Sequence, residues 1–184
     1  MEIQRTNIKG CYEISPNIFN DQRGSLIKTF HHPTFKEAGL DTIFKEQFYT
    51  ISEKNVIRGM HFQNPPHDHT KLIYCVDGEV YDFTVDLRVG SPTYSKIFST
   101  ILNSTKANMV YVPSGCAHGY CTLTNKSKVI YNVTTIYDPD FDSGVKWDSL
   151  GIKWPINDPI LSEKDLKLPE FKNFSNPFIY REKE

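Results

Sequence analysis

Short apolar segments, each followed by turn-forming residues, repeat along most of this chain. Segments of this length that are rich in β-branched and aromatic residues are typical of strands. We expect strands at residues 10–14, 25–30, 44–52, 72–76, 80–87, 94–102, 109–112, 117–123 and 128–135. Turns are expected at Asp21 to Gly24 and at Asp77-Gly78, where the second turn would join two strands as a hairpin.

Helix signals are clear in one segment, Pro33 to Gly39, which has proline at its start and glycine at its end. Many short strands with so few helices predict an all-β sandwich or barrel. From Tyr137 onward prolines interrupt the pattern, and Ser162 is expected to cap a second short helix. Residues 169–184 are polar and are expected at the surface. We expect one domain over residues 1–184, with a β core at about 10–140 and a helical and loop segment at about 141–184.

Charge and composition narrow the classes of partner. Of 184 residues, 21 are basic and 22 acidic, so the net charge of −1 gives no general attraction to nucleic acid or to a membrane surface. The N-terminus lacks an apolar signal region, and no apolar run approaches the roughly 18 residues of a membrane span. The four cysteines form no Cys-x-x-Cys pair. These features predict a cytoplasmic protein with reduced thiols.

A possible metal site is the first candidate chemistry. His67 and His69 form a His-x-His motif, and two imidazoles at this spacing on a strand share one face. With His118 as a third ligand, this is the arrangement of metal-dependent cupins. Those proteins usually add a glutamate four or five residues after the motif, where this chain has Ile73 and Tyr74. A metal-dependent cupin enzyme is therefore the alternative hypothesis.

Acid–base chemistry is the second candidate. His61 follows Arg-Gly-Met, and a histidine can act as a base near neutral pH because its pKa is about 6.5. Lys71 precedes an apolar strand, where its ammonium could face a developing oxyanion. Tyr131 lies among apolar neighbours, a setting in which most tyrosines belong to the core.

Two aspartates share one face of the strand at residues 80–87. Asp82 and Asp86 are four residues apart, so the period of two places both on the same side. If they point inward they need partners, and Arg88 or a histidine would serve. Arg23 and Arg58 each adjoin a glycine, which lets a ligand phosphate come close to the backbone.

Taken together, the motifs resemble the dTDP-4-dehydrorhamnose 3,5-epimerase family from about Gly10 to Pro169. The matching stretches are Asp21-Gln-Arg-Gly24, Asn55-Val-Ile-Arg-Gly-Met-His-Phe-Gln63, Lys71-Leu72, Gly78-Glu-Val-Tyr-Asp82, Val85-Asp-Leu-Arg88, Ser91-Pro-Thr93, Val112-Pro-Ser-Gly-Cys-Ala-His-Gly119, Tyr131, Trp154-Pro155 and Leu161-Ser-Glu-Lys-Asp165. The resemblance implies a double-stranded β-helix, or cupin-like jelly roll, in a homodimer that exchanges strands. It also implies an isomerase with no metal and no organic cofactor. Such an enzyme inverts C3, C5 or both of a nucleotide-diphospho-4-keto-6-deoxy sugar in deoxysugar biosynthesis, on the way to rhamnose-type sugars, O-antigen or capsule.

The resemblance also implies a role for each matching residue. His61 would be the catalytic base paired with Asp165, Tyr131 the acid on the opposite face of the sugar, and Lys71 the group that stabilises the enolate. The remaining implied residues bind substrate, with the arginines on the diphosphate: Arg23, Arg58, Gln47, Asp82, His118 and Tyr137.

Three departures from the family pattern bear on the substrate. After Gly24 the family usually has an aromatic residue and, three positions further on, an acid, whereas this chain has Ser25 and Lys28. The usual Gln-x-Asn becomes Gln47-Phe-Tyr49, and His69 stands where glutamine is common. These changes leave dTDP, CDP and GDP open as the nucleotide. A sugar ketoisomerase and a non-catalytic sugar-binding jelly roll remain as further alternatives.

Overall fold

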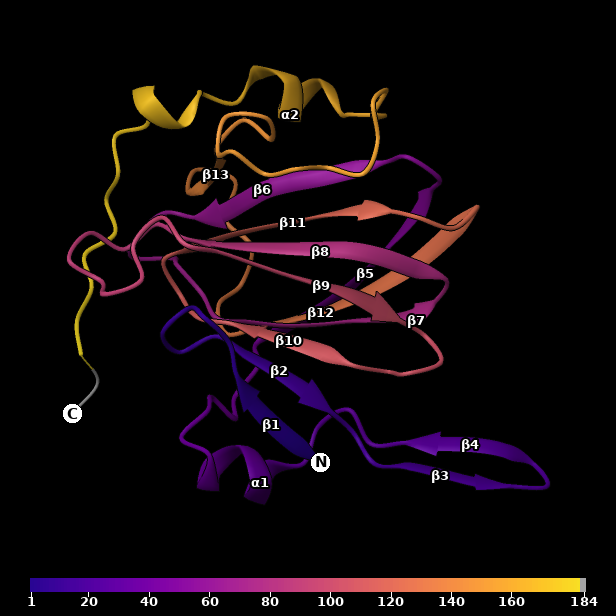
Figure 1. Cartoon of the computed structure of the whole chain (residues 1–184). Coiled ribbons are helices and arrows are strands. Elements are labelled where there is room, and N and C mark those ends of the chain that lie inside the picture. The colour runs from indigo at the N-terminus through magenta and orange to yellow at the C-terminus, as the bar shows by residue number, and fades with distance from the viewer. Residues whose placement is uncertain (183–184) are drawn as a thin grey trace.

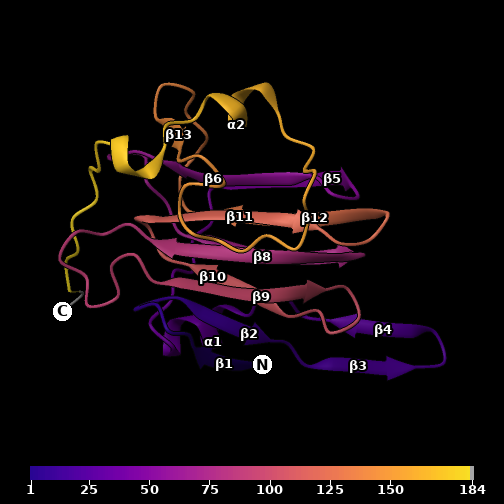
Figure 2. The ribbon, with the colours of Figure 1, turned by 45° about the horizontal axis from the view of Figure 1, so that its top comes forward.

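Two β-sheets make up most of the molecule in the computed structural model, which describes residues 1–182 (Figure 1). The six-stranded sheet has the strand order β1-β2-β10-β7-β12-β5, and the five-stranded sheet has the order β13-β6-β11-β8-β9. A separate two-stranded hairpin, β3-β4, extends away from the body in both ribbon views (Figures 1 and 2). The strands are β1 Glu2–Arg5, β2 Tyr12–Ser15, β3 Ile18–Asp21, β4 Gly24–Ile27, β5 Glu46–Glu53, β6 Ile57–Gln63, β7 Lys71–Asp77, β8 Glu79–Asp86, β9 Ile97–Asn103, β10 Met109–Val112, β11 Cys116–Thr122, β12 Lys126–Val133 and β13 Asp142–Gly144. The helices are α1 His32–Glu37, α2 Glu163–Lys167 and the 3-10 turn η1 Phe171–Asn173.

The all-β prediction is confirmed, but the hairpin expected at Asp77-Gly78 is wrong. Strand β7 pairs with β10 and β12, whereas β8 pairs with β9 and β11 in the other sheet. Gly78 has a φ of 78°, so the turn forms, but it carries the chain from one sheet to the other. Because β5 to β8 and β9 to β12 alternate between the sheets in this way, the architecture is a jelly roll.

Three apolar clusters show how the sheets are covered. Ile73 and Cys75 of β7 point into the space between the sheets, while Leu72 and Tyr74 point outward, as the period of two requires. The outer face of the six-stranded sheet is covered by α1, whose Phe35 is fully buried. Burial of a side chain of this size contributes about 2–3 kcal/mol. This helix begins with Pro33 in its first turn, so the helix prediction is confirmed.

The C-terminal segment covers the outer face of the five-stranded sheet. Phe178 is only 3% exposed and lies edge-to-face against Phe62 of β6. Phe174 and Trp154 pack on the same cluster. The expectation that residues 169–184 lie at the surface is therefore wrong for Phe174 and Phe178, and residues 183 and 184 lie outside the described residues.

The sequence suggested a β core at about 10–140. The sheets extend slightly beyond both limits, because β1 lies before residue 10 and β13 lies after residue 140. Ser162 caps α2 as expected, with its Oγ accepting a hydrogen bond of 3.1 Å from the backbone of Asp165. Over residues 1–182 no helix is long and apolar enough to cross a bilayer.

Candidate active site

A histidine and an aspartate from distant parts of the chain meet at one end of the five-stranded sheet. Nε2 of His61 on β6 lies 2.6 Å from Oδ1 of Asp165 on α2, although 104 residues separate them. The side chain of His61 remains 30% exposed, whereas that of Asp165 is 4% exposed. A buried carboxylate in this position holds the imidazole ring in a fixed orientation. The pair therefore has the geometry of a base with an orienting partner.

Two glycines bring β6 and β11 unusually close beside this histidine. A Cβ atom at Gly59, whose φ is 146°, would lie 2.6 Å from Cα of Gly119. No side chain fits in that space, so these positions accept only glycine without displacing the backbone. The register places His118 directly opposite His61, and it shifts between His118 and Tyr120.

His118 forms a second, fully internal pair with an aspartate. Its Nε2 lies 2.7 Å from Oδ2 of Asp82, and both side chains are buried. Burial lowers the pKa of His118, while the charge and hydrogen bond of Asp82 oppose that effect. Asp82 therefore points inward, and its partner is a histidine, one of the two kinds of partner that the sequence offered for an inward-pointing acid on this strand.

Asp86, on the same face of β8, finds its partner in Arg88, whose Nε donates a hydrogen bond of 2.8 Å. Burial alone would raise the pKa of Asp86, but hydrogen bonds from Arg88, Ser91 and Thr93 outweigh it and hold the pKa below its usual value. Every donor in this group belongs to a turn at the end of β8, so the group stabilises that turn.

Lys71 enters the same interior from the six-stranded sheet. Its Nζ donates a hydrogen bond of 3.0 Å to the backbone oxygen of His61, and the residue is 7% exposed. Burial lowers the pKa of this ammonium to about 8, partly offset by the charges of Asp142 and Asp82. A cation this close to His61 can stabilise an anion that forms where the histidine acts.

Tyr131 on β12 faces these groups from the opposite wall. Its ring lies edge-on to His118, with the ring centroids 5.8 Å apart. The ring of Phe48 on β5 stacks on its other side at 4.8 Å, with the planes only 9° apart. Burial raises the pKa of Tyr131 well above its usual value, so the hydroxyl keeps its proton at neutral pH.

The other residues expected to bind substrate are spread more widely. Nε of Arg58 donates to Oγ of Ser52 at 2.9 Å, at the edge of the same interior. Tyr137 follows β12 and is 55% exposed, and its hydroxyl donates to Asp142 at 3.1 Å.

The structure does not bring Gln47 or Arg23 to this interior. The side-chain nitrogen of Gln47 donates a hydrogen bond of 2.6 Å to Asn132. In the strand register this pair is next to Phe48 and Tyr131, which point inward. Because side chains alternate between the two faces of a strand, Gln47 and Asn132 lie on the outer face. Phe48 occupies the inner face instead, and the sequence had given it no role. Arg23 lies at the turn of the β3-β4 hairpin with its side chain 85% exposed and bonded to Asp21 (Figure 1).

The three histidines of the metal hypothesis each have a different partner. His67 and His69 lie in the loop after β6, not on a strand, so their spacing does not place them on one face. His67 stacks on Phe141, and Nδ1 of His69 lies 3.0 Å from Oγ1 of Thr135. Within the described residues, no group of three or more histidine, cysteine, aspartate or glutamate side chains could hold a metal ion.

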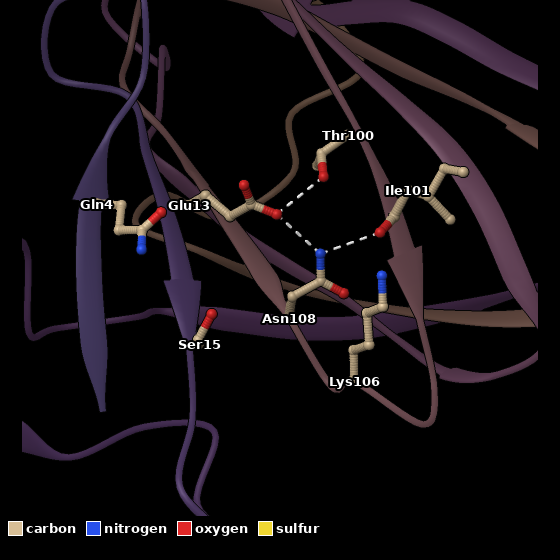
Figure 3. A pocket seen from close by; sticks show the side chains of 7 residues that line it. All are labelled: Gln4, Glu13, Ser15, Thr100, Ile101, Lys106 and Asn108. Atoms are coloured by element: carbon tan, nitrogen blue, oxygen red, sulfur yellow. Dashed lines mark hydrogen bonds between the residues drawn. The ribbon is translucent and has the colours of Figure 1, made fainter.

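A separate hollow of about 590 Å³ lies between β2 and β9 (Figure 3). Its inner polar groups satisfy one another, because Glu13 accepts hydrogen bonds from Thr100 at 2.8 Å and from Asn108 at 2.9 Å. None of the residues that line the hollow belongs to the candidate acid–base set. The lining residues are Gln4, Glu13, Ser15, Thr100, Ile101, Lys106 and Asn108.

The fold and the enclosed side chains define a class, the cupin-like jelly rolls, here with His–Asp pairs in the interior. A family model described as dTDP-4-dehydrorhamnose 3,5-epimerase matches residues 5–173. The chain belongs to this family, and it is accordingly an isomerase of the epimerase class (EC 5.1.3). The resemblance inferred from the sequence motifs is confirmed, and the epimerase reading is supported over a metal-dependent cupin enzyme.

Relatives with this function are similar over nearly the whole chain. The dTDP-4-dehydrorhamnose 3,5-epimerase of Shigella flexneri is 34% identical over 174 residues, covering 93% of this chain and 96% of its own. A solved structure of the Legionella pneumophila dTDP-6-deoxy-D-glucose-3,5-epimerase RmlC, in complex with dTDP-4-keto-L-rhamnose, has a TM-score of 0.93. It is 29% identical to this chain, covering 98% of it and 99% of its own length. The dTDP-4-dehydrorhamnose 3-epimerase of Streptomyces niveus, which is named for C3 alone, is 35% identical over 90% of this chain and 81% of its own.

Proposed function

We propose that this protein inverts C3, C5 or both of a nucleotide-diphospho-4-keto-6-deoxy sugar without a metal or organic cofactor. The observation that carries the proposal is the placement of His61, with Asp165, and Tyr131 on facing walls of one interior. Inversion removes a proton from one face of a carbon and returns one to the other face, so it requires a group on each side. The names of the relatives favour dTDP as the nucleotide.

The chemistry assigns a role to each group. A ketone at C4 acidifies the hydrogens at C3 and C5, and His61 removes one of them. The carbon–hydrogen bond pair then forms the enolate, whose charge lies on the C4 oxygen, and the ammonium of Lys71 stabilises it. Tyr131 delivers its proton to the carbon from the opposite face. His118, held by Asp82, and Arg58 bind the sugar and the diphosphate.

Arg23 reaches the substrate in this proposal only if a second copy of the chain supplies it. Strand β5 ends its sheet, and it carries Phe48 beside Tyr131. The β3-β4 hairpin leaves Phe19 and Leu26 more than half exposed, at 55% and 56%. We propose a homodimer in which the hairpin of one copy covers the β5 edge of the other. Sedimentation that gives the mass of one chain at micromolar concentration would contradict it.

The four described cysteines are free and buried, which agrees with a reducing compartment, and we propose the cytoplasm.

The test of the reaction is deuterium exchange. The protein is incubated in D2O with 4-keto-6-deoxyglucose linked to dTDP, CDP or GDP, and NMR reads deuterium at C3 and C5. Incorporation with inversion at either carbon supports the proposal and identifies the nucleotide. Absence of exchange with all three overturns it. Stoichiometric metal in the purified protein, together with loss of activity on chelation, would favour the metal-dependent alternative.

The state of Lys71 predicts the alkaline side of the pH profile. Burial disfavours its charged form, so the pKa falls to about 8 and the ammonium is lost above that pH. We expect kcat/KM to decline as pH rises through about 8, approaching tenfold per pH unit. Lys71→Arg keeps its charge at high pH, so its profile should lose this decline even if the overall rate is lower. An unchanged alkaline limb in Lys71→Arg would exclude Lys71 as its source.

A further inference from the structure

Helix α2 carries Asp165 to His61, but it has only five residues. A helix this short is not stable without contacts to the rest of the protein. It lies over β6 and β13 in both ribbon views (Figures 1 and 2). The direction of the Asp165 side chain therefore depends on whatever fixes this turn of helix.

The end of the helix is held by packing and by the backbone. A Cβ atom at Gly144 of β13 would lie 2.9 Å from Cδ1 of Leu168, so the two segments are in close contact. The backbone nitrogen of Lys146 donates to the backbone oxygen of Pro169 at 2.8 Å. Both contacts follow Asp165 in the chain.

A carboxylate at the start of β13 holds the residue immediately before Asp165. Oδ2 of Asp142 accepts hydrogen bonds from Nζ of Lys164 and, at 3.1 Å, from the hydroxyl of Tyr137. The Asp142 side chain is only 18% exposed, so this is a partly buried contact between two segments that are far apart in sequence. Tyr137 is anchored in turn, because its backbone nitrogen donates to Glu46 of β5 at 2.6 Å.

We propose that Asp142 is a positioning residue of the reaction, which holds Lys164 and Tyr137 and thereby fixes α2 in the rotation that brings Asp165 to His61. The inference rests on the proposed roles of His61 and Asp165. Asp142 touches neither the base nor the reacting carbon in the proposed mechanism. It acts through the segment that carries the partner of the base. Displacement of a catalytic group by about 1 Å can cost on the order of 100-fold in rate.

Asp142 also belongs to the charged surroundings of Lys71. The groups that favour its ammonium are Asp142, Asp82 and Cys116, and those that disfavour it are burial, Lys164 and the nearby His69. Removal of the charge on Asp142 should lower the pKa of Lys71 further. A residue that only stabilised the fold would not move the pH profile in this way.

The test uses the full chain and the substrate on which the wild type is active. Asp142→Asn is expected to lower kcat for exchange by about 10- to 100-fold with KM changed less than about threefold, and to move the alkaline limb to lower pH. Asp142→Glu should restore most of the rate. Lys164→Met should reproduce the loss of kcat. The double variant should be little worse than either single variant, because both substitutions remove the same contact between Lys164 and Asp142. Asp140→Asn, an exposed aspartate in the same segment, is the matched control and should behave as wild type.

Several results would overturn the inference. Wild-type kcat and an unmoved alkaline limb in Asp142→Asn would do so. Losses in Asp142→Asn and Lys164→Met that add fully in the double variant would do so as well. A fall in activity that only follows a lower folded fraction, measured by circular dichroism, would show a structural role and not a positioning one. These outcomes differ from failure of the proposed function, in which the wild type itself exchanges no deuterium.

Discussion

Replacing His61 by alanine is expected to lower the rate of deuterium exchange at C3 and C5 by about 10²- to 10⁴-fold, the usual contribution of a positioned general base. The variant removes the only group of the proposed mechanism that takes the proton. It also leaves Asp165 buried without its partner, so it is expected to lose stability. His61→Asn keeps a polar side chain beside that carboxylate, and it should lose the exchange while remaining folded.

The matched control for this prediction is His67→Ala. His67 stacks on Phe141 in the loop after β6, with its side chain 38% exposed. In the acid–base mechanism its removal should change the rate less than about threefold, whereas a metal site that included it would lose activity. Full exchange activity in His61→Asn would remove His61 from the mechanism. Asp165→Asn should fall between the wild type and His61→Asn, because it spares the base but not its orientation.

Replacing Tyr131 by phenylalanine is expected to separate the two halves of the reaction. The phenyl ring can still stack on Phe48 and pack against His118, so the local structure should persist. His61 can still remove a proton and return deuterium to the same face, so exchange should continue. Inversion should fall by about 10²-fold or more, because the proton donor on the opposite face is gone.

The measurement is NMR of the sugar configuration alongside deuterium content. Tyr74→Phe is the control, because Tyr74 lies on the outer face of the six-stranded sheet in the cluster under α1. It should exchange and invert as the wild type does. If Tyr131→Phe inverts at the wild-type rate, another donor supplies the opposite face and the assignment of Tyr131 is wrong.

Much of the fold could be predicted from local patterns. The limits of β10 were predicted to the residue, and α1 was recognised from Pro33 and Gly39. The crossing at Asp77-Gly78 could not be predicted, because a tight turn has the same local chemistry whether it joins neighbours in one sheet or links two sheets. Partner choice is decided by strands far away in sequence, here β12 for β7 and β11 for β8.

The candidate site divides in the same way. His61 and Lys71 are in motifs that the family resemblance identified, and the period of two predicted that Asp82 and Asp86 share one face of their strand. The pairing of His61 with Asp165 came from the resemblance alone, since no local pattern links residues so far apart. Phe48 was missed because a hydrophobic residue on an edge strand looks the same whether it faces solvent or a catalytic ring. Asp142 was missed because its partners, Tyr137 and Lys164, lie on different segments.

The dependence of His61 on Asp165 has a consequence for the order in which the protein folds and becomes active during its synthesis on the ribosome. A chain synthesised only as far as β12 already contains His61, Lys71 and Tyr131, together with most of both sheets. It lacks the carboxylate that orients the base, which is made later with α2. We therefore expect the nascent barrel to fold before its site can catalyse proton transfer. Activity should begin only when nearly the whole chain has been translated.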